Sequence, residues 1–197
     1  INWYLEMILG GCAGLLNPEQ TNFLQKAYGS AQNMVELVNQ LLMISRLESN
    51  AIVPKEQEIQ VASFFDSIAK DLQVYAQPKK CDIVMRISDA FVGPLCKDEE
   101  LLKTVIKNLM LNSIKYSNKT PVSLYLEEKD QEYLIRMEDH GIGTPRDFYQ
   151  RIFGPFSRAY IAHNKEGDGT GVGLYLIKLI VQSLEGKIWF ASELDKR

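Results

Sequence analysis

The stretch from Phe23 to Leu47 has the apolar spacing of a long amphipathic helix. Apolar or small residues recur there at alternating intervals of three and four, which suits a helix packed against other helices. The segment Asn17 to Gln20 predicts the helix start, because Asn can cap the first turn, Pro fits the first helical position and Gln completes a capping box. The repeating positions are Leu24, Ala27, Ala31, Met34, Val38, Leu41 and Ser45.

A shorter amphipathic pattern, Ile1 to Leu9, precedes this helix and starts without a capping residue, so we expect the tail of a first helix. Further apolar residues widen the stripe of the second helix beyond a two-helix seam. Since two helices cannot close a bundle, the pattern predicts a helical hairpin that dimerises into a four-helix bundle; packing of the long helix on a second domain of the same chain stays open. The widening residues are Tyr28, Val35, Leu37 and Leu42.

The rest of the chain alternates between strand and helix patterns after a polar, proline-containing stretch, Ser49 to Pro54. We therefore expect a helical part over residues 1–50, a linker over 51–55 and a second domain over 56–197. The fold class is α+β, with the second domain an α/β sandwich that has helices on one face of a mixed sheet. The expected strands lie near residues 58–61, 82–87, 122–127, 133–138 and 187–190, and the expected helices near 64–76, 98–116 and 172–184.

Composition is that of an ordinary globular protein, with 46% hydrophobic and 24% charged residues and a net charge of -3. Because no basic run occurs, nothing suggests nucleic acid or an anionic membrane surface as a partner. The three widely spaced cysteines, Cys12, Cys81 and Cys96, indicate neither a disulfide framework nor a zinc site, and they favour a reducing, cytoplasmic setting. The apolar opening, Ile1 to Leu16, is too short to span a bilayer and lacks the basic leader of a signal peptide, so we expect no direct membrane contact by this chain.

The predicted helix over residues 98–116 carries a polar stripe of Asn108, Asn112 and Lys115. These positions, i, i+4 and i+7, fall within an arc of roughly 60°. Asn is a poor helix former, so two in register need a reason other than helix stability. An amide oxygen is a ligand that Mg²⁺ accepts, and Lys115 could balance phosphate charge. A solvated helix face would look the same, so the stripe alone leaves both interpretations open.

Two glycine-rich segments could let the backbone approach a ligand. In the first, Asp139 to Gly143, the carboxylate could accept a hydrogen bond from an exocyclic amine such as that of adenine, although a tight turn explains the glycines equally well. The second, Gly167 to Gly173, runs into an apolar helix whose free N–H groups favour a phosphate chain; a flexible loop is the alternative. Its spacing matches neither the dinucleotide nor the Walker pattern.

Between the glycine segments, residues 152–165 show no clear periodicity, which indicates a lid that covers the site. Phe153 and Phe156 could anchor this lid, although two core phenylalanines are the simpler interpretation. Arg158 could reach a terminal phosphate.

Taken in order, four motifs of this chain resemble the N, G1, F and G2 boxes of sensor histidine kinases of two-component systems. The start and end of the long helix resemble the second helix of that family's dimerisation and phosphotransfer hairpin, so the resemblance covers nearly the whole chain. It implies a truncated hairpin over residues 1–50 and a histidine kinase-type ATPase fold over 56–197 that stops before its last strand. The motifs are Asn108-Leu109-x-x-Asn112-x-x-Lys115-Tyr116, Asp139-x-Gly141-x-Gly143, Phe153-x-x-Phe156 and Gly169-Thr170-Gly171-x-Gly173-Leu174.

The resemblance implies ATP and Mg²⁺ as ligands and protein-histidine kinase activity, a phosphotransferase reaction in signal transduction. Asn112 would coordinate Mg²⁺, and Asp139 would bind the adenine amino group. The γ-phosphoryl group would pass to a histidine of a homodimer, forming a phosphoprotein, and then to an aspartate of a response-regulator receiver domain. The implied ATP-binding residues are Asn108, Asn112, Lys115, Tyr116, Asp139, Gly141, Gly143, Phe153, Phe156, Arg158, Thr170, Gly171, Val172, Gly173 and Leu174.

Three departures from the family pattern matter. Neither His140 nor His163 lies in the expected His-Glu-x-x-x-Pro context, so we expect the phosphoacceptor upstream of Ile1, no catalytic residue in this chain and no autophosphorylation by it. Thr144 replaces an apolar residue. A degenerate, non-catalytic nucleotide-binding scaffold of the same fold is the alternative function. An ATP-hydrolysing machine of the wider superfamily is disfavoured, because such proteins carry a glutamate base where this chain has Asn108. Membrane anchoring of the parent protein stays open.

Overall fold

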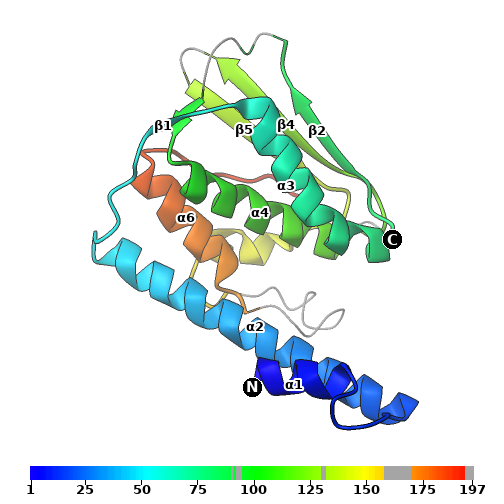
Figure 1. Cartoon of the computed structure of the whole chain (residues 1–197). Helices are drawn as coiled ribbons and strands as arrows, with labels where there is room; N and C mark the ends of the chain where they lie inside the picture. Colours follow the sequence, from blue (N-terminus) through cyan, green and yellow to red (C-terminus); the bar gives the residue numbers. More distant parts are fainter. Residues whose placement is uncertain (90, 92–94, 130–131, 158–169, 194–197) are drawn as a thin grey trace.

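The computed structural model describes residues 1–89, 91, 95–129, 132–157 and 170–193. A helical arm and an α/β part make up the molecule, and the C-terminal half of the arm lies against the α/β part (Figure 1). Within the arm, α1 (Asn2–Leu9) packs against the first half of α2 (Pro18–Glu48). The Tyr28 hydroxyl donates a 2.7 Å hydrogen bond to Glu6 Oε1 and so joins the two helices.

The start of α2 confirms the predicted capping box. The backbone N–H of Gln20 donates to Asn17 Oδ1 at 2.8 Å, and the backbone N–H of Asn17 donates to Gln20 Oε1 at 3.0 Å. Two of the N–H groups at this helix start are therefore paired with side chains, which fixes where α2 begins. Within the described residues, no helix combines the length and apolar character needed to cross a membrane.

A mixed three-stranded sheet forms one layer of the α/β part. β2 (Ile83–Ile87) pairs in parallel with β4 (Val122–Lys129), which pairs antiparallel with β5 (Glu132–Glu138). A separate antiparallel pair joins β1 (Gln57–Ile59) to β3 (Leu95–Lys97). The short β3 was not predicted.

Helices α3 (Val61–Ala76) and α4 (Glu99–Tyr116) cover one face of the sheet, which confirms the predicted sandwich (Figure 1). Alternate residues of β4 point into this layer and are fully buried, as expected for a strand with one covered face. On the opposite face Tyr125 lies between two arginines, with the Arg136 guanidinium 4.1 Å from its ring centroid. The buried β4 residues are Val122, Leu124 and Leu126.

Helix α6 (Gly173–Ser183) packs between α4 and the end of α2. Apolar residues from all three helices form a second core cluster. In α2 only Ile44 and Leu47 are buried, and both belong to this cluster. The other members are Leu101, Val105, Val172, Leu176, Ile177 and Ile180.

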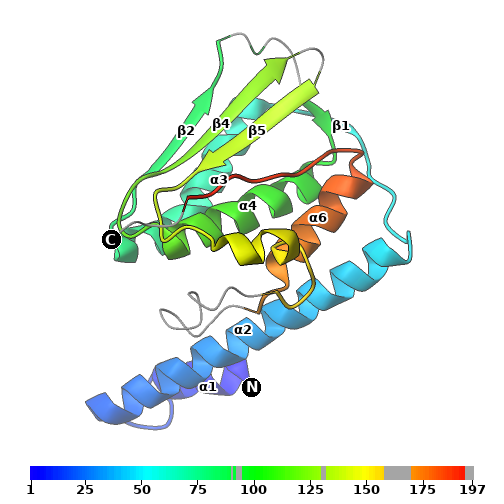
Figure 2. The same ribbon diagram turned by 180° about the vertical axis from the view of Figure 1, so that it is seen from behind.

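The predicted strand near residues 187–190 is wrong: the segment has no regular secondary structure and joins no sheet. Figure 2 shows it in red, crossing the molecule below the edge of β5. Ile188 and Phe190 are half-buried while Lys187 and Trp189 are exposed, so the alternation that suggested a strand reflects one-sided packing rather than a hydrogen-bonded ladder.

Candidate functional site

Helix α4 places the two asparagines of the polar stripe beside the start of α6. Asp98 caps α4 by accepting from the Leu101 N–H at 3.0 Å. Asn108 Nδ2 donates to the Thr104 carbonyl at 2.9 Å, which turns its Oδ1 toward α6. A Cβ built on Gly173 would lie 3.5 Å from that oxygen. The structure therefore brings Asn108 and Gly173 together, as the motif reading requires.

One turn further along α4, Asn112 is half-buried, and its side chain makes no hydrogen bond to any residue that the structure describes. Its amide oxygen is therefore available to a ligand. No group of three His, Cys, Asp or Glu side chains in the described parts of the chain could hold a metal ion. The donor that fits Mg²⁺ here is a single neutral amide oxygen, which suits an ion that brings phosphate and water oxygens with it.

Two hydrogen bonds fix the Asp139 carboxylate at the end of β5. Ser113 Oγ donates to Oδ2 at 3.1 Å, and the Gly141 N–H donates to Oδ1 at 3.0 Å. Each oxygen keeps a free lone-pair direction, so the carboxylate can still accept a hydrogen bond from a ligand amine. The sequence analysis missed Ser113; the signal was a serine directly after Asn112 on a helix whose neighbouring positions are apolar.

Gly141 lies against the end of α4 so closely that no side chain fits. A Cβ at this position would be 2.2 Å from the Tyr116 carbonyl oxygen and 2.9 Å from Asp139 Oδ1. Gly143 adopts a φ of 68°, in the left-handed region that favours glycine. Both glycines of this segment therefore have a steric or conformational requirement, which a lone turn motif did not predict.

Lys115 and Tyr116 line a cavity of about 410 Å³ at the end of α4. The Lys115 ammonium lies 5.6 Å from the centroid of the Tyr116 ring. Neither Asn112 nor Asp139 lines this cavity, although Ile142, between the two glycines, does. The structure thus places the stripe and the carboxylate on one part of the surface and this cavity next to it.

The segment after Gly143 forms the short helix η2 (Arg146–Arg151) and then separates its two phenylalanines. The Phe153 ring packs edge-on against Phe190 at 5.9 Å. Phe156 is exposed, with a φ of 54°, and lines a cavity of about 180 Å³ together with Leu41 of α2. Only Phe153 therefore matches the interpretation as a partly buried phenylalanine, and Phe156 faces the helical arm.

The start of α6 keeps the features of an anion site. Gly171 has a φ of 71°, and Val172 at the N-cap is buried and provides no side-chain cap. The Val172 N–H contacts Thr170 Oγ1 at 3.4 Å, and Leu174 is half-buried in the second core cluster. Without a side-chain cap, the first N–H groups of α6 are left for a ligand. Arg158 and Gly169 lie outside the described residues.

Comparison with known proteins agrees with this geometry. Residues 97–197 match the family described as histidine kinase-, DNA gyrase B- and HSP90-like ATPase. The sensory/regulatory protein RpfC of Xanthomonas campestris pv. campestris is 28% identical over 89% of this chain and 25% of its own length. The sensor-like histidine kinase SenX3 of Mycolicibacterium smegmatis is 30% identical over 84% of this chain and 43% of its own length.

Solved structures show the same fold. Full-length ShkA in complex with AMPPNP superposes with a TM-score of 0.77 at 23% identity, over 98% of this chain and 40% of that one. The Acinetobacter baumannii histidine kinase AdeS superposes with a TM-score of 0.74 at 20% identity, over 98% of this chain and 88% of that one.

The chain belongs to the histidine kinase-, DNA gyrase B- and HSP90-like ATPase family, in its sensor histidine kinase branch. It contains the ATP-binding core of that branch, and it spans a quarter to less than half of the curated relatives named above.

Proposed function

We propose that this chain binds ATP with Mg²⁺ between the stripe of α4, the Asp139 carboxylate and the start of α6. The single observation that carries the proposal is the Asp139 carboxylate, held at both oxygens by Ser113 and Gly141 one helical turn from the open end of Asn112. A carboxylate fixed in this way can accept a hydrogen bond from the adenine amino group while the triphosphate extends along α4 toward α6.

In this arrangement Asn112 contributes its amide oxygen to Mg²⁺, and the ion neutralises charge on the phosphates when bound. Asn108, held by Thr104, lines the phosphate path opposite Gly173. Lys115, Tyr116 and the residues from Thr170 to Leu174 complete the nucleotide contacts, and Arg158 belongs to the same proposed set. The chain's own residues bind and orient the nucleotide; the reacting histidine comes from elsewhere.

We also propose that α2 dimerises with a second copy of this chain. Large apolar side chains remain exposed on consecutive turns of the helix, on the side away from α6. Because such a stripe is unfavourable in water and follows the heptad-like spacing, a second α2 is the partner that fits it. The exposed residues are Phe23, Met34, Val35, Val38, Leu41 and Leu42.

The activity that fits these parts is a protein-histidine kinase: the γ-phosphoryl group passes to a histidine outside this chain and then to the aspartate of a response-regulator receiver domain. A cytoplasmic location would give access to ATP and the receiver. The second candidate, a non-catalytic nucleotide-binding scaffold, shares the nucleotide site and differs only in the transfer step.

Calorimetric titration with a non-hydrolysable ATP analogue and Mg²⁺ tests the nucleotide site. The unmodified chain should bind, and Asp139→Asn and Asn112→Asp should each weaken binding at least about tenfold, a loss of ~1.4 kcal/mol. Asn118→Asp, on an exposed turn after α4, is a matched control and should bind normally. Absence of heat with the unmodified chain would refute the proposal.

A longer form of the protein that includes the segment upstream of Ile1 tests the transfer step. Incubated with γ-labelled ATP, it should gain acid-labile, base-stable phosphate on a histidine, and a receiver domain should remove that label. Nucleotide binding without any labelled histidine would favour the scaffold.

A further inference from the structure

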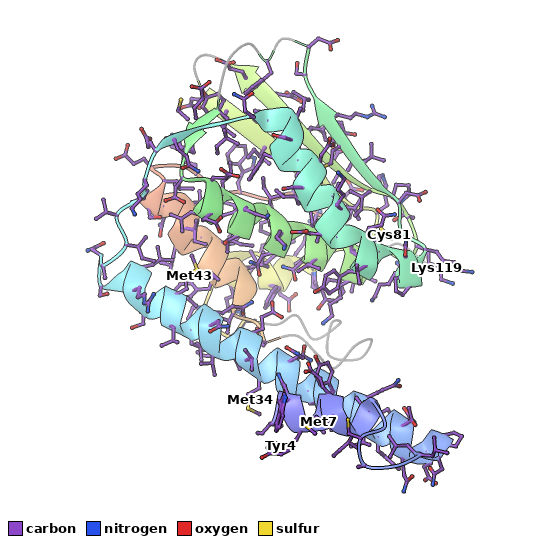
Figure 3. All side chains as sticks on the ribbon, in the orientation of Figure 1. Tyr4, Met7, Met34, Met43, Cys81 and Lys119 are labelled. Carbon is purple, nitrogen blue, oxygen red and sulfur yellow. The ribbon has the colours of Figure 1, made fainter. Side chains whose placement is uncertain are left out.

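The cavity of about 410 Å³ at the end of α4 lies next to the proposed nucleotide site but is built largely from other residues. The 3-10 helix η1 (Gln77–Lys79) and the turn between α4 and β4 form most of its wall. Figure 3 shows Lys119 of that turn at the edge of the molecule, close to Cys81. The lining residues are Pro78, Lys79, Lys80, Ile114, Lys115, Tyr116, Ser117, Asn118, Lys119 and Ile142.

The charge of this cavity is one-sided. Four lysines line it, Lys79, Lys80, Lys115 and Lys119, and none of the lining residues is acidic. Other lysines of the α/β part lie on carboxylates: Lys97 contacts Glu56, and Lys103 and Lys107 both contact Asp71. In a chain with a net charge of -3, four ammonium groups around one hollow concentrate positive potential where an anion can enter.

The backbone around the cavity is strained at two of these lysines. Lys80 has a φ of 51° and Lys119 a φ of 66°, and the neighbouring Asn118 has a φ of 52°. In this left-handed region a residue with a Cβ is less stable than glycine, and asparagine tolerates it better than lysine does. Lysine at both turns therefore sacrifices some stability, which is common where a side chain serves a ligand.

The floor of the cavity is apolar. Ile114, Ile142, Pro78 and the Tyr116 ring contribute hydrophobic surface beside the ammonium groups. The volume lies within the range of about 300–1,000 Å³ typical of small-molecule sites. An apolar floor with a cationic rim suits an organic molecule that carries a compact, multiply charged anionic group better than it suits a bare ion.

We propose that this cavity binds a small organic phosphate, with the dianionic phosphate among the four lysines and the apolar part against Ile114 and Ile142. The site is separate from the nucleotide site, because neither Asn112 nor Asp139 lines it, and the two share only Lys115 and Tyr116. A ligand here would therefore lie beside a bound nucleotide. The proposal does not depend on nucleotide binding.

Calorimetric titration with phenyl phosphate, inorganic phosphate and benzoate tests the proposed class of ligand. Phenyl phosphate should bind at least about tenfold more tightly than either of the others, since benzoate has the ring with one charge and inorganic phosphate has the charge without a ring. Benzoate equal to phenyl phosphate, or no heat with phenyl phosphate, would overturn the proposal.

The variants Lys80→Gly and Lys119→Gly should each raise the melting temperature, because glycine relieves the left-handed strain, and each should weaken phenyl phosphate binding at least about threefold. Glu185→Gly, at a left-handed position outside the cavity lining, should raise the melting temperature without weakening binding. Lys187→Gly removes one positive charge outside the cavity lining and should leave binding unchanged.

The nucleotide site is separated by one more variant. Asn112→Asp should keep its phenyl phosphate binding whether or not the unmodified chain binds ATP. Phenyl phosphate binding that is lost in Asn112→Asp and retained in both lysine variants would place that ligand in the nucleotide site and refute the separate cavity.

Discussion

Helices α3 and α2 of this molecule bury their apolar side chains to very different degrees. The 16-residue α3 has six buried residues, whereas the 31-residue α2 has two, both near its C-terminal end. The α/β part closes its own core and fixes the polar groups of the candidate site with internal hydrogen bonds. The α2 helix carries a comparable apolar pattern with nothing of this chain to cover it. The nucleotide end is therefore complete within the chain, and the helical arm is not.

Substitution of Gly141 should produce the largest effect on the complete side of this comparison. Gly141→Ala places a Cβ 2.2 Å from the Tyr116 carbonyl oxygen, so the segment that orients Asp139 must move. We expect the dissociation constant for the ATP analogue to rise at least about 100-fold, ~2.7 kcal/mol. Calorimetry measures this change.

The matched control is Gly29→Ala on the exposed surface of α2, where a Cβ would meet nothing within 4 Å. Alanine there should stabilise the helix by about 0.5–1 kcal/mol and leave nucleotide binding intact. Normal nucleotide affinity in Gly141→Ala would contradict the site geometry.

The incomplete side is tested by Val38→Glu, which puts a charge in the exposed stripe of α2. The dimer dissociation constant should rise at least about tenfold, because the carboxylate would be desolvated against a second helix. Sedimentation equilibrium measures it. Asn33→Glu, on the opposite side of α2, should leave the dimer unchanged; an equal loss in both variants would argue against this stripe as the interface.

A smaller effect is expected from Ser113→Ala, which removes one of the two hydrogen bonds to the Asp139 carboxylate. Nucleotide affinity should fall by about three- to tenfold, in line with ~1 kcal/mol for one hydrogen bond. Ser67→Ala in α3 removes a serine that bonds only to the Phe64 carbonyl, and it serves as the control in the same titration. Unchanged affinity in Ser113→Ala would mean that Asp139 does not need this partner.

The smallest effect concerns the link between the two parts, where the Tyr175 hydroxyl donates a 2.6 Å hydrogen bond to Glu48 Oε1. This bond raises the pKa of Tyr175 above its ordinary value of 10.0, because the carboxylate stabilises the protonated phenol. The stabilisation is therefore present below about pH 10 and is lost as pH rises through the pKa of the folded state.

Denaturation midpoints of the unmodified chain and Tyr175→Phe, measured between pH 7 and pH 11, check this link. The unmodified chain should be slightly more stable at neutral pH, and the difference should shrink above pH 10. A constant difference across that range would show that the hydrogen bond is not its source.

The sequence was most informative where local chemistry decides structure. Asn17 and Gln20 predicted the start of α2, and the apolar periodicity predicted α4 and α6, because capping and one-sided burial act over a few residues. The predicted strand near residues 187–190 was wrong because alternation shows which side chains are covered and not which strand supplies hydrogen bonds. Ser113 and the lysine-lined cavity were missed because they depend on contacts between segments far apart in sequence.

Native mass spectrometry of the protein with the ATP analogue and Mg²⁺ tests the central claim most directly, since it reports the number of chains and of nucleotides in one species. The account predicts a dimer that carries two nucleotides. A nucleotide-free species of any size would contradict the proposed site, and a nucleotide-bound monomer at concentrations well above those of the cell would contradict the incompleteness of α2.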